Sequence, residues 1–104
     1  MEESMNNDIR ELFSLRDEAV RNKDADQLLS TQLLELPYGS SEGYLSVDGM
    51  ETEIISLQED QGIAVAFVKE SYTPSPDGKK RNRTAFLIYF LVDTSRGWRI
   101  YQIR

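Results

Sequence analysis

The sequence contains no cysteine and no histidine, and only three of its 104 residues are proline. The missing cysteine excludes a disulfide framework and a thiol nucleophile, and the absence of both residue types excludes a zinc site of the Cys/His kind. Imidazole, the usual general base of enzymes, is missing as well. Any catalysis would have to use Asp, Glu, Tyr, Lys, Arg, Ser or Thr, and we identify no catalytic set, no metal site and no cofactor in the sequence.

Long apolar runs and a basic leader are also lacking. The first residues, MEESMNND, carry acids where a secretory signal carries basic residues. No apolar run approaches the roughly 20 residues that cross a bilayer. We therefore predict a soluble, cytoplasmic protein without membrane contact, and its length predicts a single domain, 1–104, with one core.

Charge is divided unevenly along the chain. The net charge is −6, with 4 basic and 15 acidic residues in positions 1–60 (−11) and 8 basic and 3 acidic residues in positions 61–104 (+5). Opposite charge on the two halves predicts that an acidic helical layer borders a more basic sheet layer. The alternative is that one of the halves faces a partner of opposite charge.

Two helices are predicted at the start of the chain. Apolar residues recur at helical spacing from Asn7 to Asn22, and charged residues occupy the other sides. Asp24 is a candidate N-cap for a second, shorter helix that ends by Leu36, because Pro37 disfavours helical geometry at the residue before it. The apolar stripe of the first helix consists of Ile9, Leu12, Phe13, Ala19 and Val20.

The pattern then changes to the period of two that is typical of strands. Turn-forming residues separate four runs, and these links are too short for parallel crossovers, so an antiparallel meander is predicted. A further short strand is predicted around residues 44–47. Helices followed by hairpins predict an α+β fold, with two N-terminal helices packed on a curved antiparallel sheet. The four runs are Thr52–Glu59, Gly62–Tyr72, Arg83–Val92 and Trp98–Ile103.

The third run, TAFLIYFLV, is apolar on both faces. Ile88 and Phe90 belong to one face, whereas Leu87, Tyr89 and Leu91 belong to the other. Two short helices cannot cover both faces of such a sheet, and monomers rarely expose a large apolar patch. We therefore predict a homodimer that packs through the sheet, and we assign its interface to Leu87, Tyr89 and Leu91.

Two segments carry a resemblance to a known family. NKDADQLLS (Asn22–Ser30), which joins the two helices, and FLVDTSRGWRIYQI (Phe90–Ile103), which ends the meander, resemble the small NTF2-like domains of the SnoaL and ketosteroid-isomerase type. The resemblance implies a cystatin-like cone of curved sheet around a helix. It also implies a small apolar ligand at the cone mouth and dimers packed through the sheet.

The chain departs from the enzymes of that family. It has no tyrosine before Tyr38, whereas ketosteroid isomerases carry an oxyanion-binding tyrosine on the first helix. It lacks the histidine of the dehydratases. Asp48 and Asp93 read as turn residues rather than as members of a hydrolase set. The departures favour a function other than catalysis.

Four aromatic residues are our candidates for a ligand site: Tyr38, Tyr44, Trp98 and Tyr101. Ligand sites combine apolar walls with a few polar groups, and Tyr38 and Tyr44 lie in the link that would rim a cone. The alternative for all four is packing in the core or an interface, which is common for aromatic residues in sheets.

The basic run Lys79–Arg83 could contact phosphates, but it lies at a hairpin turn without interleaved aromatic residues, so nucleic-acid binding is not expected.

The sequence therefore supports three hypotheses. The leading one is a non-enzymatic, homodimeric NTF2-like domain that binds a small ligand or another protein. The alternative is a small isomerase or hydrolase that uses tyrosine and aspartate in the cone. The third is an interaction protein whose acidic helical half binds a basic partner.

Overall fold

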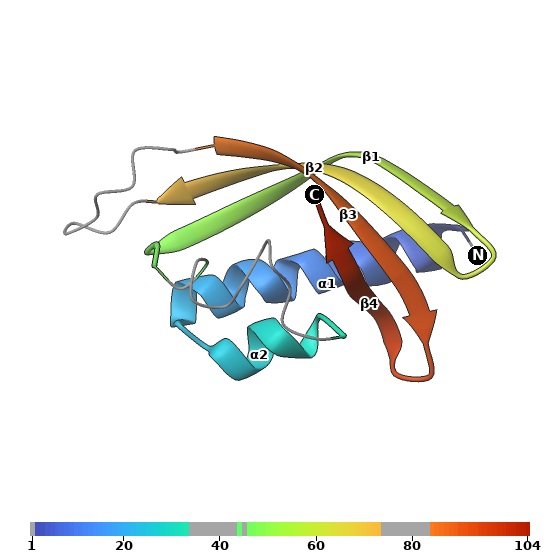
Figure 1. The fold of residues 1–104 in the computed structure, drawn as a ribbon, viewed down its shortest axis with the longest axis horizontal. Coiled ribbons are helices and arrows are strands. Elements are labelled where there is room, and N and C mark those ends of the chain that lie inside the picture. The colour runs from blue at the N-terminus through green and yellow to red at the C-terminus, as the bar shows by residue number, and fades with distance from the viewer. Residues whose placement is uncertain (1, 34–43, 45, 74–83) are drawn as a thin grey trace.

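The computed structural model describes residues 2–33, 44, 46–73 and 84–104, and it has the predicted α+β architecture. The four strands form one antiparallel sheet in the order β1-β2-β3-β4, with the helices on one side of it (Figure 1). Tyr38 and Lys79–Arg83 lie outside the described residues. The elements are α1 (Glu2–Asn22), α2 (Ala25–Ser30), β1 (Gly49–Asp60), β2 (Ile63–Thr73), β3 (Thr84–Thr94) and β4 (Gly97–Ile103).

The second helix begins as predicted and ends earlier. Asp24 is its N-cap, and the Asp24 carboxylate accepts a hydrogen bond from the backbone N–H of Gln27 at 3.1 Å. The helix ends at Ser30 because the chain then pairs with β4: Ile100 donates to the carbonyl of Thr31 at 2.9 Å and accepts from Leu33 at 2.9 Å. At residues 31–33, pairing with the sheet therefore replaces the helix that the sequence pattern predicted there.

The hairpin turns have the conformations that their residues favour. Gln61 and Gly62, between β1 and β2, both have positive φ (52° and 82°), as expected of a tight two-residue hairpin turn. The predicted strand at 44–47 is wrong: Tyr44 is helical, and residues 46–48 form a turn and bends. The side chains of Tyr44 and Val47 are buried in the same cluster, which an alternating strand would prevent because it would direct them to opposite faces.

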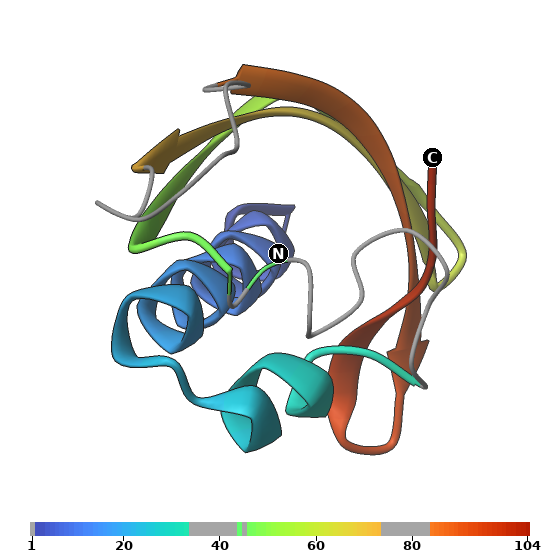
Figure 2. The same ribbon diagram turned by 60° about the vertical axis from the view of Figure 1, so that its left-hand side comes forward.

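The sheet curves around α1, which lies in its concave side (Figure 2). Aromatic and aliphatic side chains of α1 and of the inner sheet face form the main core, and a smaller cluster forms between α1, α2 and the start of β1. The described part of the chain contains no helix that is both long and apolar enough to cross a membrane. The main core consists of Ile9, Leu12, Phe13, Ala64, Ala66, Val68, Tyr89, Leu91, Trp98, Ile100 and Ile103.

The helices cover only this inner face, and the opposite face, which we call the outer face, remains exposed and apolar. The residues predicted for a dimer interface lie on the wrong side: Tyr89 and Leu91 are 0% exposed, and Leu87 packs against the same core. Strict alternation divides β3 into two faces, but it does not say which one the helix covers. The exposed apolar residues of the outer face are Ile63, Val65 and Phe67 of β2 with Phe86 and Ile88 of β3, from 37% to 58% exposed.

Candidate functional site

A cluster of polar side chains is buried inside the cone. Its members come from α1 (Arg16), from the segment that precedes β1 (Tyr44), from β2 (Glu70 and Tyr72) and from β3 (Tyr89), and we call it the Arg16–Glu70 cluster. Arg16, Glu70 and Tyr89 are 0% exposed. Fully buried arginine and glutamate side chains are rare unless they have polar or charged partners, so both are expected to have such partners here.

Glu70 is surrounded by tyrosine hydroxyls. Tyr44 lies 3.0 Å from both of its carboxylate oxygens, Tyr72 donates to Oε1 and Tyr89 donates to Oε2. The hydroxyls of Tyr44 and Tyr89 are also 2.7 Å apart. A carboxylate that accepts several hydrogen bonds can remain buried as an anion, because the donors replace its hydration shell.

Arg16 lies on the other side of Tyr89. Its Nη1 donates to Thr31 Oγ1 at 2.7 Å and to Gln32 Oε1 at 2.8 Å, and its Nη2 is 3.5 Å from the hydroxyl of Tyr89. The guanidinium carbon is 5.2 Å from the ring centre of Tyr44 and 5.3 Å from that of Tyr89. Arg16 therefore ties α1 to the end of α2, and its charge is linked to Glu70 through a phenol.

Burial and the charge of Glu70 have opposite effects on the pKa of Arg16, whereas both raise the pKa values of the tyrosines. Burial alone would lower the pKa of Arg16, but the phenols and Glu70 outweigh it and hold that pKa above its usual value. Burial, reinforced by the charge of Glu70, raises the pKa values of Tyr44 and Tyr72, and burial together with Tyr44 raises that of Tyr89. The three hydroxyls are therefore neutral donors at neutral pH.

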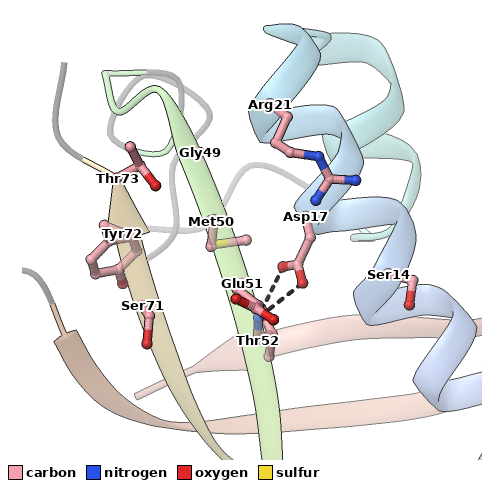
Figure 3. Close-up of a pocket in the computed structure, with 10 residues that line it drawn as sticks. All are labelled: Ser14, Asp17, Arg21, Gly49, Met50, Glu51, Thr52, Ser71, Tyr72 and Thr73. Atoms are coloured by element: carbon pink, nitrogen blue, oxygen red, sulfur yellow. Dashed lines mark hydrogen bonds between the residues drawn. The ribbon is translucent and has the colours of Figure 1, made fainter.

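A polar groove runs between α1 and the start of β1, next to this cluster (Figure 3). Asp17 projects from α1 towards β1 and accepts hydrogen bonds from the backbone N–H of Thr52 at 2.8 Å and from its hydroxyl at 2.6 Å. Burial raises the pKa of Asp17, and the bonds from Thr52 partly oppose this. The groove has a volume of about 630 Å³, and Tyr72 both lines it and donates to Glu70, so this side chain contacts both the groove and the buried carboxylate.

The three predicted ligand residues that the structure describes do not form one site. Tyr44 belongs to the Arg16–Glu70 cluster, whereas Trp98 is buried in the main core. Tyr101 is on the outer face, where its ring lies 6.1 Å from that of Phe90. Ligand binding by these residues stays a prediction, and among the three that the structure describes only Tyr44 contacts the polar cluster.

Sequence reasoning missed Arg16 and Glu70, although both carry a signal. Arg16 follows Leu12 by four residues and Phe13 by three, so it continues the apolar stripe of α1. Glu70 follows Val68 in the alternation that buries the inner face of β2. A charged residue at a core position of a regular pattern predicts a buried, partnered charge.

The cluster combines one carboxylate, three phenols and one guanidinium. Such a set can hold a proton or orient a polar group, because phenols both donate and accept. The described residues contain no group of three or more acids that could hold a metal ion. The Nε of Arg16 is buried without a hydrogen-bond partner, so the guanidinium still has donor capacity inside the cone.

Comparison with known proteins identifies the fold. No family model matches the sequence, and no curated protein matches it. The structure is similar to a protein of unknown function with a cystatin-like fold from Nostoc punctiforme (TM-score 0.71, 13% identity, covering 94% of this chain and 86% of that one). It is also similar to an NTF2-like protein of unknown function from Shewanella baltica (TM-score 0.67, 10% identity, covering 94% and 89%) and to a protein from Kribbella flavida (TM-score 0.64, 18% identity, covering 100% and 90%). The cone of sheet around α1 is therefore the cystatin-like, NTF2-like fold that the sequence predicted.

Proposed function

We propose that the protein is a non-enzymatic, homodimeric interaction module with an NTF2-like fold, and that the outer face of its sheet is the surface between two copies. The observation that carries this proposal is the row of exposed apolar side chains on the two central strands, of which Phe86 is 58% exposed. Monomeric proteins rarely expose such a contiguous patch.

The side chains of this surface are arranged by the regular register of β2 and β3. Phe67 and Phe86 stack with ring centres 6.0 Å apart, and Val65 is directly opposite Phe90 in the strand register. Residues in a regular sheet lose little further freedom on binding, so little of the gain from burial is offset by ordering. The polar flanks of β1 and β4 would form the rim of such an interface.

The test is the dissociation constant of wild type and two lysine variants, measured by analytical ultracentrifugation. Ile88→Lys puts a charge in the centre of the outer face and should weaken the dimer by roughly 2 kcal/mol or more, about thirtyfold in Kd. Leu15→Lys is the matched control, because Leu15 is on α1 and is as exposed as Ile88 (39% against 38%). A wild type that is monomeric at high micromolar concentration contradicts the proposal.

The second candidate is a small enzyme or binding protein that uses the Arg16–Glu70 cluster. The observation that favours it is a buried carboxylate that meets the hydroxyl of Tyr44 inside the cone. Perturbed ionisable groups gathered in one place are typical of functional sites, although structural networks produce them too.

This candidate is tested by ligand-observed NMR with a library of small neutral carbonyl compounds and small carboxylic acids. Specific binding should be lost in Tyr44→Phe, which removes one hydroxyl of the cluster, and retained in Tyr101→Phe, which removes a hydroxyl from the outer face. Equal binding to both variants, or to neither wild type nor variant, would eliminate the cluster as the site.

A further inference from the structure

The two edges of the outer face carry opposite charge. Side chains that are directly opposite one another in an antiparallel sheet share a face, so Asp60, opposite Ile63, and Arg99, opposite Val92, both belong to the outer face. Arg104 belongs to it as well, because its backbone pairs with Ile88. The β1 edge is therefore acidic and the β4 edge basic, with the apolar row between them.

The register arranges these side chains in rows that cross the sheet. One row runs from Asp60 through Ile63 and Val92 to Arg99. The next row runs from Gln58 through Val65 and Phe90 to Gln102. Both rows are apolar in the middle and polar at the ends, and in the first row the two ends carry opposite charges. If the first row is placed opposite a copy of itself in reverse order, Asp60 faces Arg99 and Ile63 faces Val92. The row is therefore complementary in charge to its own reverse.

A symmetric homodimer that packs through the outer face can have one of two arrangements. A two-fold axis that stacks two sheets face to face lies in the plane between them. If the axis is parallel to the strands, β1 of one copy lies over β4 of the other, and each row meets its own reverse. If the axis crosses the strands, β1 lies over β1, and acids face acids.

Like charges placed opposite each other across an interface are costly, whereas complementary charges fix the register. Glu53 is directly opposite Lys69 of its own protomer, and the row of Glu51 does not reach β4. Asp60 is therefore the acid of the β1 edge whose row ends in a basic residue on β4. Aligned stacking of two sheets, with strands within about 30° of each other, is also a standard mode of sheet packing.

We propose that the second copy of this chain docks about a two-fold axis parallel to the strands, so that Asp60 faces the partner's Arg99 and Ile63 faces the partner's Val92. This inference rests on the dimer proposed above. The symmetry gives two such charge pairs in each dimer, at opposite ends of one continuous apolar row.

The experiment measures the Kd of the dimer for charge-reversal variants by analytical ultracentrifugation in low salt. Asp60→Arg should raise Kd about tenfold, because it replaces two attractive pairs by two repulsive ones. Combining it with Arg99→Asp restores the complementarity and should return Kd to within about threefold of wild type. The difference between wild type and Asp60→Arg should shrink in 0.5 M salt, since rim charges are screened.

The matched control is Glu51→Arg, which changes the net charge by the same amount. Glu51 is opposite Ser71, whose neighbour on β3 is Thr84, and this row does not reach β4. Because the protein is acidic overall, with a net charge of −6, general repulsion between copies would be reduced equally by both single variants. If Asp60 pairs with the partner's Arg99, the Kd of Asp60→Arg should be higher than that of Glu51→Arg. General repulsion alone predicts equal values.

The outcomes separate the inference from the proposed function. A dimer that is tightened or unchanged by Asp60→Arg overturns the strand-parallel axis and leaves the homodimer standing. A wild type that does not dimerise overturns the homodimer itself. The fluorescence of Trp98, which is 6% exposed in the core, shows whether each variant is folded. If Arg99→Asp does not fold, the comparison of Asp60→Arg with Glu51→Arg still decides the question.

Discussion

Removing one of the two charges of the Arg16–Glu70 cluster should lower the free energy of unfolding strongly. Removing the remaining charge from that variant should lower it much less. Glu70→Gln converts the hydrogen bonds from three phenols into neutral ones and leaves the guanidinium of Arg16 without a compensating charge. Hydrogen bonds to charged groups contribute about 1 kcal/mol more than neutral ones, so we expect a loss of about 3 kcal/mol. Arg16→Met loses the bonds to Thr31 and Gln32 and should cost a similar amount.

The double variant distinguishes a coupled network from two separate contacts. It leaves no charge in the Arg16–Glu70 cluster, so its free energy of unfolding should lie at least about 1 kcal/mol above the value that the two single effects predict by addition. Urea unfolding followed by the fluorescence of Trp98, the single tryptophan, gives all four free energies at one fixed protein concentration. Glu70→Gln combined with Lys23→Met is the control, because Lys23 pairs with Asp48 at the surface, 3.8 Å away.

The reasoning fails if Arg16→Met and Glu70→Gln are additive to within about 0.5 kcal/mol, which is the behaviour of independent sites. That result would mean that the hydroxyl of Tyr89 does not link the two charges. The control pair is expected to be additive within that limit.

Two further predictions concern the same fold. The tyrosines of the cluster have raised pKa values, so they stay protonated when folded while tyrosines of the unfolded chain ionise near pH 10. Their contribution to stability is complete below pH 10 and should decline as the pH rises above it; urea midpoints measured from pH 8 to 11 check this, with a smaller decline expected in Tyr89→Phe. Asp24→Ala should cost about 1 kcal/mol because it removes the N-cap of α2, whereas Asp26→Ala, in the first turn of the same helix, should cost less than half of that; thermal unfolding of both variants decides it.

Sequence reasoning succeeded where a local pattern determines the structure. The stripe from Ile9 to Val20 and the N-cap at Asp24 located both helices, and turn residues such as Gly62 separated the strands. It failed where a distant contact outweighs the local pattern. The end of α2 is an example, since Leu33 and Thr31 bond to Ile100, about 70 positions further along the chain.

The candidate site shows the same division. Tyr44 was recognised as a site residue from its place in the link, but its partner Glu70 was not, because the two are 26 positions apart. Nothing in a single sequence says which distant hydroxyls surround a given carboxylate. The interruption of an apolar pattern by Arg16 could have indicated a buried charge, without identifying what compensates it.

By itself the sequence determined the order of helices and strands, the antiparallel meander and the presence of two apolar faces on β3, because periodicity, capping and turn chemistry act over a few residues. Only the tertiary structure decided which of those faces is the core. The position of α1 in the concave side buries Tyr89 and Leu91 and leaves Phe86 and Ile88 exposed. The same folding brings Arg16, Tyr44, Glu70, Tyr72 and Tyr89 together from four separate segments, because burying their charges and hydroxyls is favourable only when all of them meet.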